Sequence, residues 1–236
     1  LCIVSGAFIY IQRIPENPAM YIVSTGKQDK ETIALADGAA VKLGAGSKLA
    51  YPDQFITKER LVKLDGQAFF EIARNPGKRF VVEAGNVRIT ALGTEFEVFF
   101  DNKNNLVETI LLNGKVEVEY RNAVSNEYIS RMLSPDHKLI VNTETGNMQL
   151  ESINSDNYSA WRNYEGLNFV SEKLSVIITR LEDWYGISIT CESEKILNER
   201  FTFKIRNEAP DRILKNMSQT SSVKFRRDDL KYTLFE

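Results

Sequence analysis

The sequence is short of histidine, of cysteine and of any excess of one charge, and each shortage excludes a class of protein. His137 is the only histidine, which excludes a metal site built from several histidines and leaves one place for a histidine-based triad. Cys2 and Cys191 lie far apart, so disulfide crosslinks are not the basis of stability. A formal net charge of −2 offers no basic field for nucleic acid.

The chain also lacks an apolar run of the roughly 20 residues that cross a bilayer. Leu1–Ile11 is nevertheless uncharged and largely apolar, and we interpret residues 1–13 as the remnant of a transmembrane helix with Tyr10 at the interface. A buried strand and a lipoprotein start at Cys2 are the alternatives. Residues 14–20 contain two prolines and are expected to form a linker.

A glycine-centred phrase is present four times in the first half of the chain, around Gly38, Gly66, Gly93 and Gly114. Apolar residues lead into each turn signal, and alternating residues follow it. The spacings are 28, 27 and 21 residues (38 to 66, 66 to 93, 93 to 114), which is within the range of solenoid repeats. We therefore expect residues 21–150 to form a mainly β domain, either solenoid-like or roll-like, or an open sandwich.

Alternating apolar residues and turn dipeptides predict the strands of this domain. Hairpin turns are expected at Asp37-Gly38, Asp65-Gly66, Gly85-Asn86, Asn113-Gly114 and Thr145-Gly146. The expected strands are Met20–Ser24, Lys30–Leu35, Ala40–Leu43, Lys48–Tyr51, Arg60–Leu64, Gln67–Ala73, Phe80–Ala84, Val87–Ala91, Glu95–Phe100, Leu106–Leu112, Lys115–Tyr120, Tyr128–Leu133 and Lys138–Asn142.

The pattern changes after a polar linker at residues 151–160. Residues 161–236 predict the order β-α-β-β-α-β-β, a small two-layer α+β domain. Ser171 is the expected N-cap of the first helix, Gly186 its end, and Pro210 the first turn of the second helix. Strands are expected at Leu167–Val170, Ile187–Cys191, Phe201–Ile205, Val223–Arg226 and Tyr232–Phe235.

Two functions that use polar or aromatic side chains remain possible from the residues alone. Glu71 with Glu95 or Glu97 could supply the two acids of a glycosidase, although strand alternation places all three on the polar face opposite Phe70 and Phe96. A carbohydrate-binding β module could use a stacking platform of aromatic side chains, namely Trp161, Trp184 and Tyr185.

Several phrases, taken in order, resemble one family. The first domain contains S-K-L-A-Y-P at Ser47–Pro52, F-I-T-K-E-R-L-V-K-L-D-G-Q-A-F-F-E-I-A at Phe55–Ala73, F-V-V-E-A at Phe80–Ala84, V-R-I-T-A-L-G-T-E-F-E-V at Val87–Val98 and L-L-N-G-K-V-E-V at Leu111–Val118. These phrases resemble the periplasmic domain of FecR-type anti-sigma factors. Gln67 stands where that family usually has Glu, and Pro135-Asp136 where it often has Pro-Gly.

The resemblance continues past the linker. W-R-N-Y-E-G-L-N-F-V-S-E-K-L at Trp161–Leu174, L-E-D-W-Y-G-I-S-I at Leu181–Ile189 and F-T-F-K-I at Phe201–Ile205 are similar to the C-terminal domain of such proteins. That domain in turn resembles the short N-terminal (STN) signalling domains of secretins and TonB-dependent receptors. The resemblance covers roughly residues 21 to 236.

The resemblance implies a signalling protein of the Gram-negative inner membrane, with one membrane span and with this chain mostly in the periplasm. Its implied partners are the signalling domain of an outer-membrane TonB-dependent receptor and, through a cytoplasmic segment outside this chain, an extracytoplasmic-function sigma factor. It implies regulation of transcription by cell-surface signalling, with no catalytic residue, cofactor or metal.

Signalling of this kind requires a protein surface, and addition of a partner strand to an open sheet edge is one way to provide it. We expect the edge at Phe201, Phe203 and Ile205, with Tyr232–Phe235 as the alternative. Partner binding would then change the arrangement of the two domains, or expose Arg13–Met20 to proteolysis.

Overall fold

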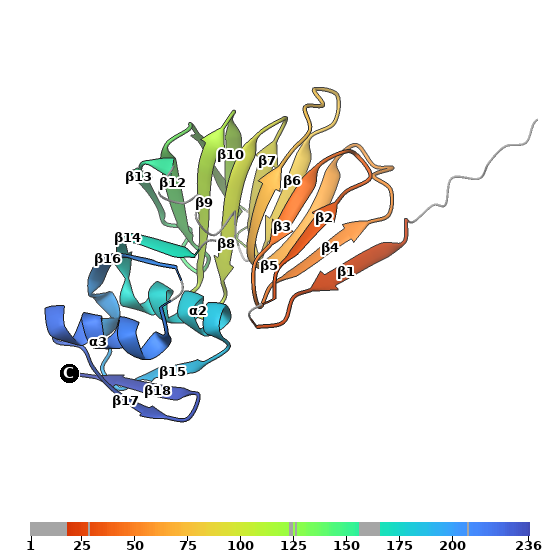
Figure 1. Ribbon diagram of the computed structural model, residues 1–236. Helices are drawn as coiled ribbons and strands as arrows, with labels where there is room; N and C mark the ends of the chain where they lie inside the picture. The colour runs from red at the N-terminus through yellow and green to blue at the C-terminus, as the bar shows by residue number, and fades with distance from the viewer. Residues whose placement is uncertain (1–17, 28, 123–124, 126, 156–165, 207) are drawn as a thin grey trace, which may run out of the picture.

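The computed structural model describes residues 18–155, with gaps at 28, 123–124 and 126, and residues 166–236, with a gap at 207. A large β domain is followed by a small α+β domain (Figure 1). This confirms a mainly β first part and a small α+β second part, including the element order β-α-β-β-α-β-β of the latter. Leu1–Ile11, Tyr10 and Trp161 lie outside the described residues.

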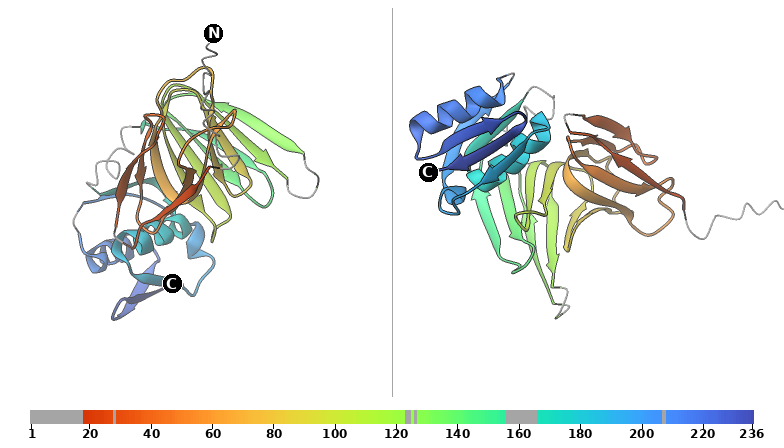
Figure 2. Two further views of the ribbon diagram at one scale, coloured as in Figure 1. Left: turned by 90° about the vertical axis from the view of Figure 1, so that its right-hand side faces the viewer. Right: turned by 90° about the horizontal axis from the view of Figure 1, so that it is seen from below.

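The β domain is one 13-stranded sheet that curls into a half-barrel (Figures 1 and 2). Its main path runs β11-β10-β7-β6-β5-β8-β9-β12-β13, and β1 to β4 pair beside β5. The strands are β1 Met20–Ser24, β2 Glu31–Ala34, β3 Ala40–Leu43, β4 Lys48–Pro52, β5 Arg60–Glu71, β6 Phe80–Ala84, β7 Val87–Ala91, β8 Glu95–Asp101, β9 Leu106–Asn113, β10 Val116–Arg121, β11 Tyr128–Leu133, β12 His137–Asn142 and β13 Met148–Ser152.

Within the β domain, pairing between the described strands is antiparallel except for β5–β6, which is parallel. Coils of a β-helical solenoid stack in parallel, so the similar spacing of the glycine phrases does not reflect a solenoid. The sheet is a curled half-barrel, which corresponds to the roll-like alternative.

The curl depends on β5, which belongs to both halves of the sheet. Its first half pairs with β4 and β6, and its second half pairs with β3 and β8. We call the strands on the β4/β6 side the first half-sheet and those on the β3/β8 side the second half-sheet. Gly66 lies at the junction with φ +92°, and a Cβ there would lie 2.8 Å from Ser47 Cβ. Glycine therefore permits the bend.

Two of the expected hairpin turns are wrong, because one lies inside β5 and the other lies where the chain crosses between the half-sheets. Asp65-Gly66 lies inside the continuous strand β5, where two strands were expected. Asn113-Gly114 joins β9 to β10, but these strands pair with different neighbours, so the chain crosses there between the half-sheets. The turns at Asp37-Gly38, Gly85-Asn86 and Thr145-Gly146 do connect paired strands, as expected. Strand β13 was not expected and extends to Ser152.

The inner faces of both half-sheets enclose the core of the β domain. Strand alternation points one side chain in two inward, and the members include Phe70, Phe96, Val98, Val116 and Val118, all with no exposed surface. The rings of Phe70 and Phe96 stack with centroids 5.1 Å apart. The apolar residues of the glycine phrases thus form the scaffold of this domain.

The α+β domain has three layers, where two were expected. Helices α2 (Leu174–Tyr185) and α3 (Pro210–Thr220) lie between a two-stranded and a three-stranded sheet (Figure 1). The first sheet is β14 (Leu167–Lys173) with β16 (Arg200–Ile205), and the second has the order β15 (Ser188–Cys191), β18 (Lys231–Phe235), β17 (Lys224–Asp228). A short 3-10 helix, η2 (Ile196–Asn198), precedes β16.

The ends of the helices are partly as expected. Gly186 ends α2 in the left-handed conformation, and Pro210 begins α3. Ser171 is not the N-cap of α2, because it lies within β14 at φ 49° and the helix begins three residues later. No helix in the described part of the chain is both long and apolar enough to cross a membrane.

The α+β domain packs on the outer face of the second half-sheet, through β14 and α2 (Figures 1 and 2). Phe69 of β5 is 1% exposed and belongs to the core of the α+β domain, and Leu112 of β9 packs against the same core. This contact fixes the direction in which β16 and α3 face.

Replacing Gly66 by alanine tests the bend in β5. We expect Gly66→Ala to lower the free energy of unfolding by about 2 to 4 kcal/mol, because a positive φ and a clash with Ser47 act together. Gly77→Ala is the matched control, since the nearest atom to its added Cβ is Asn75 Oδ1 at 3.7 Å. Urea unfolding measures both. Equal stability of the two variants would contradict the role of Gly66.

Candidate partner-binding groove

Strand β16 is an open edge of its sheet. It pairs with β14 in antiparallel register, with Phe203 opposite Phe169 and Ile205 opposite Leu167. Among the described residues no other strand pairs with β16. Its outer side therefore presents a row of backbone groups to which a further strand could bind.

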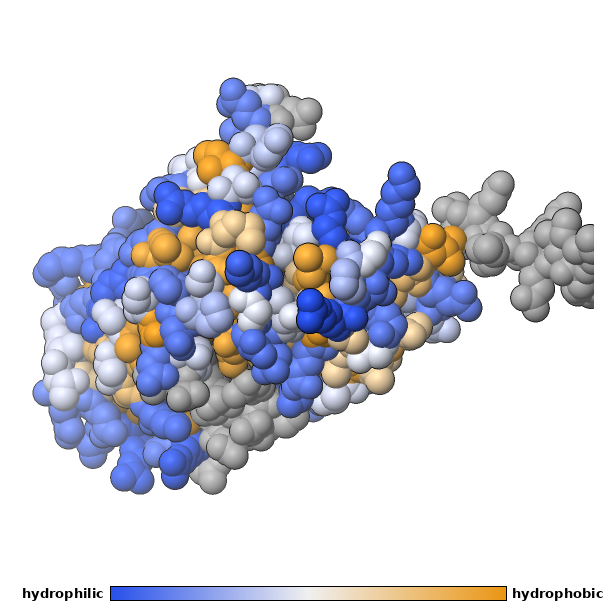
Figure 3. All heavy atoms as spheres, turned by 90° about the horizontal axis from the view of Figure 1, so that it is seen from above, coloured by the Kyte–Doolittle hydropathy of each residue, from blue (hydrophilic) through white to orange (hydrophobic). Residues whose placement is uncertain are grey.

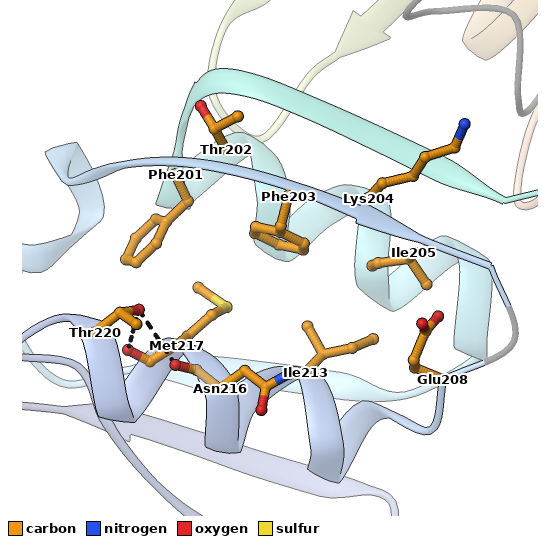
Figure 4. A pocket seen from close by; sticks show the side chains of 10 residues that line it. All are labelled: Phe201, Thr202, Phe203, Lys204, Ile205, Glu208, Ile213, Asn216, Met217 and Thr220. Atoms are coloured by element: carbon orange, nitrogen blue, oxygen red, sulfur yellow. Dashed lines mark hydrogen bonds between the residues drawn. The ribbon is translucent and has the colours of Figure 1, made fainter.

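The side chains of β16 alternate between two directions (Figure 4). Phe201, Phe203 and Ile205 point toward α3, as strand alternation predicted, and Thr202 and Lys204 point away from it. Between β16 and α3 lies a groove of about 250 Å³. Five of the six β16 residues, Phe201–Ile205, line this groove. The rest of the lining comes from the segment leading into α3 and from the helix itself, namely Glu208, Ile213, Asn216, Met217 and Thr220.

The groove has an apolar floor and a polar rim. Ile205, Ile213 and Met217 are buried, whereas Phe201 and Phe203 are half-buried and present part of each ring to the groove. The Phe203 ring also contacts Phe169 of β14, with centroids 5.0 Å apart. The exposed ring surface is the kind that an apolar side chain of an added strand would cover.

Hydrogen bonds hold α3 against the rest of the domain. Tyr185 Oη donates to the backbone carbonyl of Glu208 at 2.6 Å. Burial, together with the nearby Glu208 carboxylate, raises the pKa of Tyr185 to about 12, so the hydroxyl remains a donor at neutral pH. At the start of the helix, Asp211 accepts hydrogen bonds from Tyr232 Oη at 3.1 Å and from Arg227 at 2.6 Å. The groove is thus bounded by a positioned helix.

The alternative edge at Tyr232–Phe235 is wrong. These residues belong to β18, which lies between β15 and β17, so both of its edges are already paired. Sequence reasoning also missed the α3 wall of the groove. The spacing of Ile213, Asn216, Met217 and Thr220 marks one helical face and was the available signal.

The structure brings together only two of the three proposed glycosidase acids. Glu71 and Glu95 face each other across β5 and β8, and both line a shallow cleft of about 340 Å³. Glu97 lies outside that cleft, is 2% exposed and accepts a hydrogen bond from Gln67 at 2.6 Å. Glu71 is exposed and pairs with Lys42 at 3.4 Å, so it lacks the apolar surroundings that are typical of a general acid.

The other side chains considered for chemistry have structural contacts. Lys30 Nζ lies 3.2 Å from the centroid of the Trp184 ring, which is half-buried, and Tyr185 packs beside the domain core. Lys30 therefore covers one face of the Trp184 ring, and Trp161 lies outside the described residues. His137 is at the start of β12, and its Nδ1 lies 2.8 Å from the Pro135 carbonyl oxygen.

The sequence matches the models of a known protein family. The FecR protein family model matches residues 21–117, and the FecR C-terminal model matches residues 166–234. Two crystal structures of a candidate anti-sigma factor from Parabacteroides distasonis ATCC 8503, at 1.65 and 2.50 Å resolution, have a TM-score of 0.83 to this chain. Each is 25% identical and covers 92% of this chain and 99% of its own.

No curated protein matches the chain. Both domains are nevertheless matched by models of one family, and the order of the two domains is the one that the sequence motifs indicated. The protein therefore belongs to the FecR family of anti-sigma factors.

Proposed function

We propose that this chain is the periplasmic sensor portion of a single-pass inner-membrane anti-sigma factor. It relays the state of an outer-membrane TonB-dependent receptor to an extracytoplasmic-function sigma factor by protein–protein contact. Membership of the FecR family supports the anti-sigma role. The receptor, the membrane topology and the periplasmic location are the further content of the proposal, and the uncharged segment Leu1–Ile11 supports the membrane anchor.

The observation that carries the proposal is the open edge of β16 above an apolar groove. An added strand would form main-chain hydrogen bonds with this edge, and every second side chain would point into the groove. Phe201 and Phe203 would cover its apolar side chains, while Glu208 and Asn216 at the rim would select its polar ones. Backbone pairing supplies affinity in this mode and the pockets supply specificity.

A direct test is capture of purified receptor signalling domains from the same genome by the full chain. We expect one of these domains to bind. Capture of none of them, together with a clean calorimetric titration by an oligosaccharide, would contradict the proposal and favour the carbohydrate-binding alternative.

Variants in the groove test where the partner binds. We expect Phe203→Pro to abolish capture, since proline disrupts the strand at the edge. Because Phe203 also contacts Phe169, Asn216→Arg is the second variant, as it fills the groove from the exposed rim. We expect it to weaken binding at least about tenfold, or about 1.4 kcal/mol.

Gln219→Arg is the matched control, because Gln219 is exposed on the same helix and does not line the groove. Circular dichroism establishes that each variant is folded. Unchanged affinity in folded Phe203→Pro and Asn216→Arg proteins would place the partner on another surface.

A further inference from the structure

Charged side chains are buried where the α+β domain covers the second half-sheet. Glu108 of β9 and Lys138 of β12 are each 1% exposed, and they face Glu172 of β14 and Arg180 of α2, which are 4% and 5% exposed. Buried charges are rare unless they are paired, because removing an ion from water is expensive. The docking of the two domains therefore depends on how fully these buried charges are paired with one another.

The groups form a connected cluster. Arg180 Nη2 donates to Glu108 Oε2 at 2.6 Å, and the guanidinium carbon lies 4.5 Å from the centroid of the Phe99 ring. Lys138 Nζ lies 3.3 Å from Glu172 Oε2 and 3.2 Å from Glu151 Oε2. The cluster spans both domains, so every one of its ion pairs except Lys138–Glu151 is lost when they separate.

In the three ion pairs of the cluster, three carboxylates share two cations. Glu97, which is buried on the same covered face of the second half-sheet, adds a further carboxylate to this region. Burial, and then the neighbouring Glu108 carboxylate, raises the pKa of Glu172, while Lys138 and Arg180 oppose this shift. One proton on Glu172 lowers the negative charge of this region by one. The charges of the docked arrangement are therefore closer to balance when Glu172 carries a proton.

A second group of contacts lies at the same interface. Lys103 pairs with Glu182 of α2 at 2.7 Å, and Asn104 donates to Thr179 at 3.3 Å. Burial raises the pKa of Asp183 to about 6, with Glu182 and Asp101 adding to the shift and Lys103 and Lys27 opposing it. Asp183 also lies against Gly46 of the β domain.

Strand β14 connects the cluster to the groove. Glu172 lies opposite Phe201 of β16, next to a bulge between Phe169 and Glu172. Within the bulge Ser171 has φ 49°, which is uncommon for serine, and its N–H donates to Thr202 Oγ1 of β16 at 2.8 Å. A strand added to β16 would therefore act on the segment that holds Glu172 in place.

We propose that Glu108, Lys138, Glu151, Glu172 and Arg180 form a releasable latch between the two domains, and that β14 links this latch to partner binding at β16. The latch itself is inferred from the geometry of the interface. The link to partner binding rests on the proposed function. Release would change how the two domains are arranged, which is the kind of change a relay requires.

The sign of the pH effect follows from the proton balance. A carboxyl whose pKa is higher in the docked state binds its proton there first, so docking strengthens as the pH falls through that value and weakens as the pH rises. Burial raises the pKa of Asp183 from 3.8 to about 6, so this group should strengthen docking from about pH 7 to pH 5, by at most about tenfold if the whole shift arises on docking. Glu172 acts in the same direction.

Two lysines at the interface do not reverse this effect. Burial lowers the pKa of Lys30, beside Trp184, to about 8, so Lys30 stays protonated in this pH range. Lys103 has its pKa raised, chiefly by its hydrogen bond to Glu182, and it too stays charged.

The test is energy transfer between dyes on the two domains of the full chain. Cysteines replace the exposed Ser130 of β11 and Lys215 of α3, after Cys2 and Cys191 are changed to serine. We expect transfer to fall as the pH rises from about 5 to 7. Glu172→Gln should keep the domains docked at the higher pH and reduce the pH dependence, and adding Asp183→Asn should remove the rest.

Arg180→Gln should lower transfer at every pH, because Glu108 loses its cation. The control is Arg226→Gln, whose ion pair with Glu192 is remote from the interface. A pH response of Glu172→Gln and of the double variant equal to that of the unsubstituted labelled chain would overturn the latch.

Amide hydrogen exchange in Arg200–Ile205 tests the link through β14 without any partner. We expect exchange to be several-fold faster in Arg180→Gln and slower in Glu172→Gln than in the unsubstituted chain. Unchanged exchange in both would overturn the link and leave the latch standing. Failure to capture a receptor domain, with both of these results as expected, would overturn only the proposed function.

Discussion

The bend of β5 at Gly66 is the constraint on which the other parts of the molecule depend. Because one strand belongs to both half-sheets, the bend lets their inner faces close on one core and turns the outer face of the second half-sheet toward the α+β domain. That domain uses this face as its support and leaves the edge of β16 open. The groove is therefore positioned by a glycine that lies far from it in the sequence.

The same half-sheet has two different faces. Its inner face is apolar and is enclosed by the β domain itself, and its outer face carries Glu97, Glu108 and Lys138 among apolar residues. A wholly apolar outer face would hold the α+β domain permanently. Buried ion pairs add little net stability and respond to charge state, and the proposed latch depends on this property. This property suits a protein that must change arrangement when a partner binds.

The sequence predicted local features well and long-range features poorly. Alternation identified most strands and the face of β16 that carries Phe201 and Phe203, because side-chain direction is a local property. Asp65-Gly66 predicts a hairpin turn from its dipeptide chemistry, which is the same inside a bent strand. Whether a strand is an edge, and whether Glu108 is covered, depends on segments many residues away that no local pattern reports.

Strand β16 is the surface to which, in this proposal, a receptor signalling domain adds a strand. Amide hydrogen exchange of the complex with a captured domain tests it most directly, since edge pairing protects backbone N–H groups. The account predicts new protection within Arg200–Ile205 and none in β11, an open edge of the β domain whose Tyr128 and Met132 are exposed. Protection of β11 with no change in β16 would contradict it.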